Sequence, residues 1–238
     1  MKIALVGYGK MGKTIEEIAL EKGHEIIYRI DINNQDLLEK ENLQQADVAI
    51  EFSTPDTAYH NILKCLEAGV PVVSGTTGWL DKLEDIKQRC RQHNGAFLYA
   101  SNFSIGVNIF FEINKKLAEL MASQEQYEIS MEEVHHTQKK DAPSGTAITL
   151  AEQILERIDR KSTWINELTD NPSELSIISK RIDPAPGTHT VNYHSKIDDI
   201  TIIHTAHSRK GFASGAVIAA EWLVGKKGIF GMKDVLGL

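Results

Sequence analysis

The stretch EEVHHTQKKDAPSGTA (residues 132–147) holds the side chains best suited to chemistry. It places two carboxylates, two adjacent histidines and two lysines ahead of a Pro-Ser-Gly-Thr sequence. Histidine exchanges protons near neutral pH, and lysine offers a proton and a positive charge. Three kinds of site are compatible with such a stretch: an acid–base centre for an anionic substrate, a metal site, and a solvated loop.

The acid–base interpretation needs a particular local structure. Gly145 and Thr146 are predicted to lie in the first turn of a helix, where backbone N–H groups and the helix dipole favour a carboxylate. In a continuing strand, His135 and His136 would face opposite ways. Both reach one ligand only if the strand ends there, and the turn-like residues that follow predict that it does. Lys139 lies close to another lysine, and a lysine among cations gives up its proton more readily.

The metal interpretation needs a third ligand near the two histidines. No CxxC, HExxH or carboxylate–His spacing supplies one locally. We therefore expect no metal here.

A second motif, GYGKMG, opens the chain at residues 7–12. It follows an apolar run at 3–6, precedes a helical pattern at 13–22, and lies about 20 residues before Asp31. This context is that of a dinucleotide-binding turn, with Asp31 on the ribose hydroxyls and the phosphates at the helix N-terminus. The residues expected to bind the cofactor in this turn are Gly7, Tyr8, Gly9, Lys10, Met11 and Gly12.

Loops after the later strands are expected to complete a cofactor cleft. Ligands of open parallel sheets bind beyond the carboxyl ends of the strands, and here these ends carry FSTP, GTTG and ASNF. Asn102 is expected to hydrogen-bond the nicotinamide carboxamide. The other residues assigned to the cofactor are Gly75, Thr76, Thr77, Ala100, Ser101 and Phe103.

These motifs are positioned by a strand–helix alternation over the first hundred residues. Short apolar strands are predicted over 3–6, 25–32, 47–52, 70–74 and 96–100, with helices over 13–22, 55–68 and 80–92. Such alternation predicts right-handed crossovers and a mostly parallel sheet of the Rossmann type.

The strand–helix alternation ends after Asn102, and a second α+β domain with a mixed sheet is predicted there. Its helices are expected over 107–121 and 144–158, and its strands over 127–134, 176–182, 188–193 and 200–206. Residues 159–173 show no pattern and are expected to form a surface connection. A helix over 215–224 is expected to return to the first domain. The predicted domains are therefore 1–103 with 212–238 for the dinucleotide, and 104–211 for substrate and oligomerisation.

Composition limits the classes of partner. The chain has 238 residues, 42% of them hydrophobic, and a net charge of −7, which disfavours nucleic acid and anionic membranes as main partners. No segment approaches the length that spans a bilayer. The two cysteines, Cys65 and Cys90, lack CxxC spacing and fit a reducing compartment, so we expect a cytoplasmic protein.

In order and spacing, the segments GYGKMG, GTTG, SNFSIGVN, EEVHHTQKKDAPSGTA and HTAHSRKGFASGA resemble the 4-hydroxy-tetrahydrodipicolinate reductases (dihydrodipicolinate reductases) of lysine and diaminopimelate biosynthesis. The resemblance covers nearly the whole chain, and HHxxKxDAPSGT is its most specific element. It implies that His135 is the general acid/base and that Lys139 is the proton donor. It also implies that His136, Gly145 and Thr146 bind a small cyclic dicarboxylate.

The resemblance also bears on the cofactor and the assembly. It implies an NAD(P)H-dependent reductase and a homotetramer built through the sheet of the second domain. Asp31 predicts NADH preference because its carboxylate would repel a 2′-phosphate, while Lys10 leaves NADPH use open. Arg209 is expected to hold the domain junction. His189, His204 and His207 are expected to be strand histidines without a catalytic role.

Two other functions stay open on the sequence. One is a different Rossmann dehydrogenase that acts on an amino acid or an aldehyde. The other is a non-catalytic NADH sensor, which would keep the glycine turn and Asp31 but would have no need for His135 and Lys139.

Overall fold

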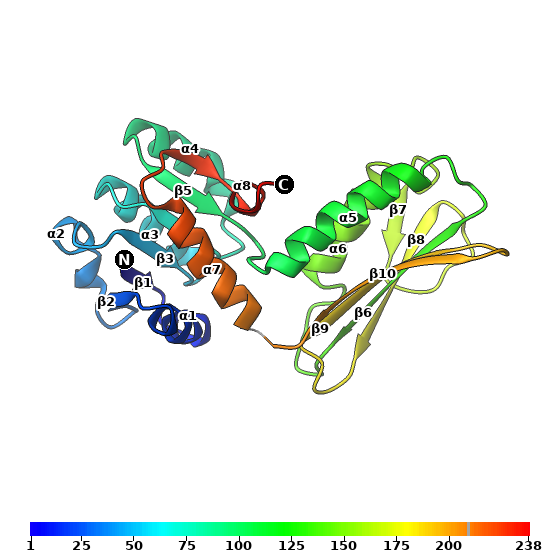
Figure 1. The fold of residues 1–238 in the computed structure, drawn as a ribbon, viewed down its shortest axis with the longest axis horizontal. Helices are drawn as coiled ribbons and strands as arrows, with labels where there is room; N and C mark the ends of the chain where they lie inside the picture. The colour runs from blue at the N-terminus through cyan, green and yellow to red at the C-terminus, as the bar shows by residue number, and fades with distance from the viewer. Residues whose placement is uncertain (209) are drawn as a thin grey trace. The chain divides into compact units, whose positions relative to one another are not determined.

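The computed structural model describes residues 1–208 and 210–238 (Figure 1). The chain forms two compact units. Unit 1 comprises Met1–Ile105 and Lys210–Leu238, and unit 2 comprises residues 106–209 as far as they are described. Arg209, expected at the domain junction, lies outside the described residues. No helix in the described part of the chain is long and apolar enough to cross a bilayer.

Unit 1 contains a six-stranded sheet in which every pairing is parallel, with the order β11-β5-β4-β3-β1-β2. This arrangement confirms the predicted Rossmann-type sheet. The strands are β1 (Lys2–Val6), β2 (Glu25–Ile30), β3 (Val48–Glu51), β4 (Val72–Ser74), β5 (Ala96–Tyr99) and β11 (Gly228–Phe230).

Helices cover both faces of this sheet because alternate residues of each strand point to opposite sides. Ile3 and Leu5 pack on the side of α1 (Lys10–Glu21) and α7 (Lys210–Leu223), which lie next to each other in Figure 1. Ala4 and Val6 pack on the opposite side. The helices on that side are α3 (Pro55–Glu67) and α4 (Leu83–Gln92).

Several short elements of unit 1 escaped the sequence patterns. The helical segments are η1 (Gln35–Leu38), α2 (Lys40–Leu43) and α8 (Met232–Leu236). The helix predicted over 80–92 is present as η2 (Leu80–Lys82) followed by α4. Helix α7 begins at Lys210 rather than at 215, so Gly215 lies inside it. A Cβ at Gly215 would lie 1.8 Å from the carbonyl oxygen of Phe103, so this glycine permits close packing and does not start the helix.

Unit 2 contains a five-stranded mixed sheet with the order β10-β9-β6-β8-β7. Its strands are β6 (Glu128–His135), β7 (Thr163–Ile165), β8 (Glu174–Arg181), β9 (Gly187–His194) and β10 (Asp199–Ala206). β9 runs antiparallel to β6 and β10, whereas β6, β8 and β7 are parallel. The predicted mixed sheet is confirmed. Strand β7 lies within 159–173, where only a surface connection was expected.

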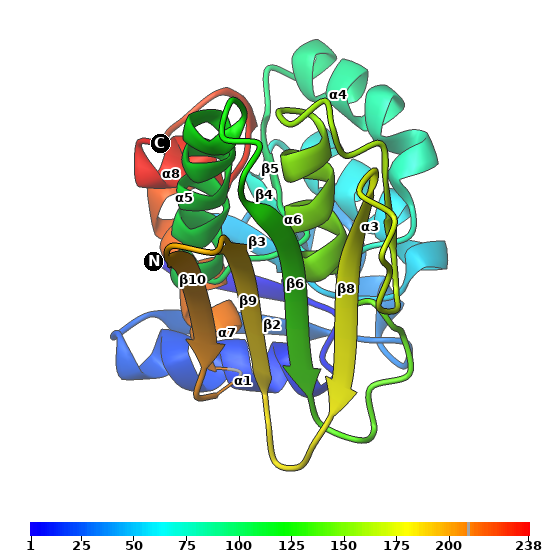
Figure 2. The same ribbon diagram turned by 90° about the vertical axis from the view of Figure 1, so that its right-hand side faces the viewer.

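Two helices cover one face of the second sheet, α5 (Ile105–Met121) and α6 (Gly145–Leu155) (Figure 2). Ile129 and Met131 of β6 and Val191 and Tyr193 of β9 fill the core beneath these helices. The side chains of β6 alternate between buried and half-buried, so every second residue up to His135 belongs to this covered face.

Candidate active site

The turn after β1 leaves space for a ligand at one glycine. Gly7 has φ +95°, and a Cβ there would lie 2.0 Å from the carbonyl oxygen of Phe52. A Cβ at Gly12 would lie 2.4 Å from the carbonyl oxygen of Gly7. At Gly9, by contrast, no heavy atom of the described residues other than Gly9 and its two chain neighbours lies within 4 Å of the Cβ position. The turn is therefore closely packed at Gly7 and Gly12 and open at Gly9.

A pocket of about 290 Å³ lies beside this turn, within unit 1. Four of the residues assigned to the cofactor line it, namely Gly7, Tyr8, Gly9 and Asp31. The other lining residues are Val6, Ile30, Ile32, Gln35, Phe52, Ser53, Thr54, Thr57 and Asn61. None of the described residues that line the pocket is Lys or Arg, so Asp31 carries its only charged side chain.

The other predicted cofactor residues lie outside that lining. Lys10, Met11 and Gly12 form the first turn of α1, which begins three residues earlier than predicted. The loops after β4 and β5 start at the same edge of the sheet, because the Gly75 N–H donates to Glu51 O (3.0 Å) and the Ala100 N–H donates to Ser74 O (3.2 Å).

The side chains of these two loops differ in exposure. Thr76 and Phe103 are buried, and Thr77 and Ser101 are exposed. The Oδ1 atom of Asn102 accepts the Ser104 N–H at 2.9 Å. Its carboxamide is therefore oriented by its own loop.

A buried carboxylate, Glu51, joins the loop after β3 to the loop after β4 and was not assigned a role from the sequence. It is fully buried at the end of β3. Its oxygens accept hydrogen bonds from the hydroxyls of Ser53, Ser74 (2.6 Å) and Thr76 (2.9 Å) and from the Ser53 N–H (3.0 Å). Burial raises the pKa of Glu51, and these donors oppose that shift. The sequence feature that could have drawn attention to Glu51 is its position as an acidic residue in an otherwise apolar strand.

In unit 2, β6 ends at His135. This is the strand end that was predicted as the condition for His135 and His136 to reach one ligand. His135 is buried and continues the covered face of the sheet, whereas His136 lies beyond the strand end and is half-buried. Ser144 caps α6, and its hydroxyl oxygen accepts the Ala147 N–H at 3.2 Å. Gly145 and Thr146 therefore occupy the first helical turn, as predicted. Apart from the chain neighbours of Gly145 and the backbone of its own helix, no heavy atom of the described chain lies within 4 Å of its Cβ position.

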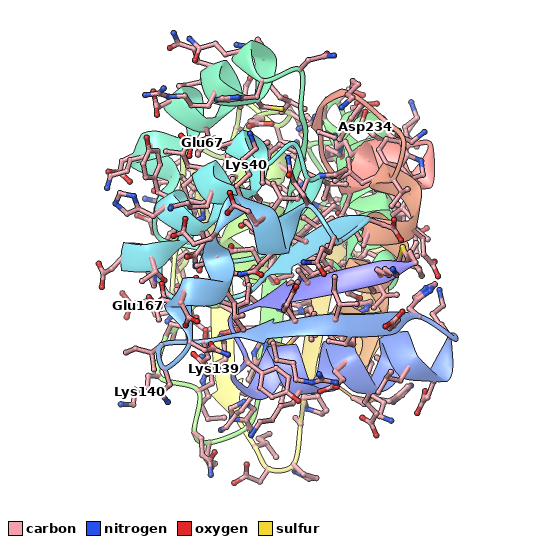
Figure 3. All side chains as sticks on the ribbon, turned by 90° about the vertical axis from the view of Figure 1, so that its left-hand side faces the viewer. Lys40, Glu67, Lys139, Lys140, Glu167 and Asp234 are labelled. Carbon is pink, nitrogen blue, oxygen red and sulfur yellow. The ribbon has the colours of Figure 1, made fainter. Side chains whose placement is uncertain are left out.

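Lys139 and Lys140 lie on the loop between β6 and α6, and Figure 3 labels both. The prediction that Lys139 lies among cations is wrong in one respect, because its ammonium pairs with a carboxylate. Its ammonium contacts the two carboxylate oxygens of Asp141 at 2.8 and 2.9 Å, and this ion pair lowers the pKa of Asp141. Lys140 is exposed.

Four residues close to His135 received no role in the sequence analysis: Glu133, Ser144, Arg181 and His189. Glu133 Oε2 lies 2.8 Å from Nδ1 of His135, and Nη2 of Arg181 lies 3.1 Å from Oε1 of Glu133. The Ser144 hydroxyl lies 3.0 Å from Nε2 of His189, whose ring centre lies 5.1 Å from that of His135. His189 is thus part of the cluster around His135, so its expected place as a strand histidine is correct but incomplete.

This cluster also supplies the third ligand that the sequence lacked for a metal. One atom each of Glu133, His135 and His189 lie within 4.8 Å of one another. The carboxylate already has the Arg181 guanidinium and the Ser144 N–H as partners. Its charge is therefore balanced by protein groups.

His189 gives unit 2 a pH-dependent stability. Burial, followed by the nearby His135, lowers the pKa of His189 from 6.5 to about 4. The folded state therefore binds this proton less tightly than the unfolded state does, and stability is lost as pH falls from 6.5 towards 4. We expect the free energy of unfolding to drop by at most about 3 kcal/mol from this group across that range. In His189→Gln, the urea midpoint of unfolding should therefore fall less steeply as the pH is lowered from 6.5 towards 4. The control His194→Gln changes an exposed histidine, and its urea midpoint should depend on pH as that of the parent chain does. Identical curves for His189→Gln and the parent would contradict a neutral buried imidazole.

Comparisons with known proteins identify relatives of the whole chain. The family model described as dihydrodipicolinate reductase, N-terminus, matches residues 1–103, and the C-terminus model of the same family matches residues 106–236. A 4-hydroxy-tetrahydrodipicolinate reductase of Christiangramia forsetii is 54% identical over 238 residues, 99% of this chain and 98% of that protein. One from Methanosarcina mazei is 35% identical, over 99% of this chain and 89% of that protein.

A solved structure shows the same fold. It is a dipicolinate-bound dihydrodipicolinate reductase from Paenisporosarcina sp. TG-14, with a TM-score of 0.77, 24% identity and 98% coverage of both chains. Both family models match in chain order and together span nearly all of the sequence. The chain therefore belongs to the dihydrodipicolinate reductase family, a family of pyridine-nucleotide-dependent oxidoreductases, as its motifs predicted.

Proposed function

We propose that this chain reduces 4-hydroxy-tetrahydrodipicolinate to tetrahydrodipicolinate with NAD(P)H, a step of lysine and diaminopimelate biosynthesis. The observation that carries the proposal is the 54% identity, over essentially the full length of both chains, to a curated reductase of that name. The chemistry requires a hydride source, groups that hold two carboxylates, and a proton donor. Each requirement has candidate residues in this chain.

The residues of unit 1 fit a nicotinamide dinucleotide. Gly9 opens the turn towards free space, and the first turn of α1 presents N–H groups without a side-chain cap at Gly9. Asp31 lines the adjoining pocket, where its carboxylate would accept hydrogen bonds from ribose hydroxyls. When bound, the nucleotide supplies the hydride that adds to the far end of the conjugated C=C–C=N system of the dehydrated ring.

The residues of unit 2 bind the substrate and transfer the proton. Gly145 and Thr146 offer helix N-terminal N–H groups to a substrate carboxylate. His136 is the further donor assigned to the substrate. His135 acts as the general acid/base at the end of β6. Lys139 delivers the proton to the ring carbon next to the one that receives hydride. Asp141 holds the Lys139 ammonium in place through contacts to both of its carboxylate oxygens before the substrate arrives.

The experiment that tests this function is NADH oxidation followed by absorbance, with the substrate made in situ by a separate synthase from pyruvate and aspartate semialdehyde. We expect oxidation only when the synthase and both of its substrates are present. Oxidation of NADH with aspartate semialdehyde alone would favour a different Rossmann dehydrogenase, one that reduces this aldehyde to an alcohol. Tight NADH binding without turnover under any of these conditions would favour a sensor.

We propose that NADH is preferred and that NADPH is also accepted. The pocket beside the glycine turn contains Asp31, and none of its described lining residues is a cation that would pair with a 2′-phosphate. Arg29, two residues before Asp31, pairs with Glu16. Lys10 at the start of α1 is exposed and is the candidate partner that makes NADPH use possible.

Asp31→Ser should reverse this preference. Removing the carboxylate deletes hydrogen bonds to the ribose and the repulsion of a 2′-phosphate, so kcat/KM for NADH should fall about tenfold and the NADPH-to-NADH ratio should rise by about 10- to 100-fold. Steady-state kinetics with both cofactors measure the change. Asp36→Asn, which removes an exposed charge outside the pocket lining, is the control and should leave the ratio unchanged. A large NADPH preference in the parent chain would contradict the role given to Asp31.

Two substitutions in the glycine turn should distinguish an effect on NADH binding from an effect on stability. Gly9→Ala places a methyl group in open space, so the melting temperature should stay unchanged while the Kd for NADH rises about tenfold through contact with the phosphates. Gly12→Ala would bring Cβ to 2.4 Å from Gly7 O and should lower the free energy of unfolding by about 1–3 kcal/mol. Calorimetry and NADH fluorescence titration measure both quantities. Unchanged NADH affinity in Gly9→Ala would contradict a phosphate site at this turn.

We also propose that the chain forms a homotetramer through unit 2 and acts in the cytoplasm. β10 is an edge strand of the second sheet and exposes Ile203, which is 60% accessible, so it offers both backbone groups and apolar surface to another copy. The free thiols Cys65 and Cys90 are buried and fit a reducing compartment. Sedimentation equilibrium tests the assembly, and a monomer at micromolar concentration would contradict it.

A further inference from the structure

Glu133 lies where the covered face of the second sheet changes from apolar to polar. Along β6 and β9, paired rows run from Ile129 opposite Tyr193 to Met131 opposite Val191, and then to Glu133 opposite His189. The first two rows belong to the apolar core beneath the helices. Glu133 is 0% exposed although it carries a carboxylate. A buried carboxylate at the end of a core row requires compensation by specific partners.

These partners come from four directions and converge on the two carboxylate oxygens. Arg181, on β8, lies 3.1 Å from Oε1, and the Ser144 N–H at the start of α6 donates to the same oxygen at 3.2 Å. His135, on the same strand, places Nδ1 2.8 Å from Oε2, and Nε2 of His189 lies 4.0 Å from that oxygen. Burial opposes ionisation, but His135 and Ser144 outweigh it, so the pKa of Glu133 is lowered and the group is an anion.

The contact between Glu133 and His135 is close but not in line. Oε2 and Nδ1 are 2.8 Å apart, yet among the described residues neither atom has a hydrogen bond of good geometry. A rotation of the ring would bring the Nδ1–H group onto the oxygen. The other ring nitrogen, Nε2, lies on the side of Gly187, where a Cβ would come within 3.0 Å of it. Glycine at this position keeps space beside Nε2.

We propose that Glu133 is a positioning residue that fixes the ring of His135 with Nδ1–H directed at the carboxylate, so that Nε2 is the atom that exchanges the proton. This inference rests on the proposed function of His135 as the acid/base. A carboxylate behind an imidazole selects the tautomer and stabilises the imidazolium when it forms. Arg181 contributes by holding the carboxylate, and it also binds the loop itself through the carbonyl oxygens of Lys139 (3.3 Å) and Asp141 (2.6 Å).

Glu133→Gln removes the charge and keeps the shape. We expect kcat to fall by about 10- to 100-fold with the Kd for NADH unchanged, because the cofactor is assigned to the other unit. The control is Glu132→Gln, the adjacent carboxylate on the opposite side of β6, which pairs with Lys180 (2.6 Å) at the surface. It should retain parent activity. Glu133→Gln with parent kcat would overturn the proposal.

A nitrogen-15 NMR spectrum of the histidine rings provides a readout independent of turnover. In the parent chain the neutral His135 ring should show the Nδ1–H tautomer, identified by its disappearance in His135→Gln. In Glu133→Gln the ring should shift towards the Nε2–H tautomer or a mixture of both. A spectrum of His135 that does not change with Glu133→Gln would overturn the proposal even if activity fell, since the loss would then be structural.

A double-mutant cycle separates this inference from the proposed function. If Glu133 acts through His135, Glu133→Gln should cause no further loss of kcat in the His135→Gln background. Fully additive losses would overturn the inference while leaving His135 as the acid/base. If His135→Gln is itself fully active, the proposed function of His135 fails first. Loss of parent activity on chelation, restored by Zn²⁺, would assign Glu133 to a metal and would also overturn the positioning role.

Discussion

Replacing His135 by Gln is expected to lower kcat by about 10²-fold or more while leaving the Kd for NADH within a factor of two. Gln keeps a hydrogen-bonding side chain of similar reach but does not exchange protons at neutral pH. The residue lies in unit 2, at the end of β6 beside a buried carboxylate, whereas the glycine turn assigned to the cofactor belongs to unit 1. The loss should therefore appear in turnover and not in nucleotide binding.

Rapid-mixing kinetics and NADH fluorescence titration on the same preparation measure the two quantities. The matched control is His194→Gln, which changes an exposed histidine paired with Asp199 on the same sheet. It should behave like the parent chain. Retained turnover in His135→Gln, with a folded protein by circular dichroism, would contradict the assignment of an acid/base role.

Lys139→Met should lower kcat by about 10²- to 10³-fold, because the variant keeps the length of the side chain but lacks a proton to deliver. The Lys139 side chain is ordered by the two contacts to Asp141 and is only 22% exposed. Lys140→Met alters the exposed neighbouring lysine and should keep most of the parent activity. Single-turnover kinetics with saturating NADH measure the chemical step directly.

The comparison between the two lysines decides which charge matters. If Lys139→Met and Lys140→Met lose activity equally, the loop contributes only its positive charge, and neither lysine is a specific proton donor. If Lys140→Met is the impaired variant and Lys139→Met is not, the residue assignment taken from the motif is wrong. Asp141→Asn should have a smaller effect than Lys139→Met, because it leaves the ammonium in place and removes only its holder.

The parts of the fold that the sequence predicted are those encoded by neighbouring residues. The run Ile3 to Val6, the glycines behind it and the helix that follows form one contiguous βα unit, so periodicity and turn chemistry suffice to identify it. The same holds for the start of α6, where Ser144 caps the helix that begins at Gly145. Family membership followed from motifs of this local kind.

The parts that the sequence did not predict depend on register between distant strands. His189 reaches Glu133 because β9 pairs antiparallel with β6 in one particular register, across more than fifty residues of chain. Arg181 reaches it from β8 in the same way. Strand β7 has three residues and is recognisable only through its pairing with β8. Periodicity within a segment carries no information about such partners, so the cluster behind His135 was invisible in the sequence.

Glu51 illustrates a signal that was visible but had no interpretation. A charged residue inside an apolar strand is unusual, and its meaning became clear only when the hydroxyls of Ser53, Ser74 and Thr76 were found around it. Ser74 lies at the end of the neighbouring strand β4, and Thr76 lies in the loop that follows it. The carboxylate therefore joins the loop after β3 to the loop after β4.

The most direct test of the central claim is the mass of the product formed with NADH deuterated at the transferred position. With the cyclic substrate made in situ, we expect tetrahydrodipicolinate carrying one deuterium at a ring carbon, and a second label from D₂O at the adjacent carbon when the solvent is exchanged. Ring product without deuterium from the nucleotide, or deuterium found only in a product of aspartate semialdehyde, would contradict hydride transfer to this ring by this chain.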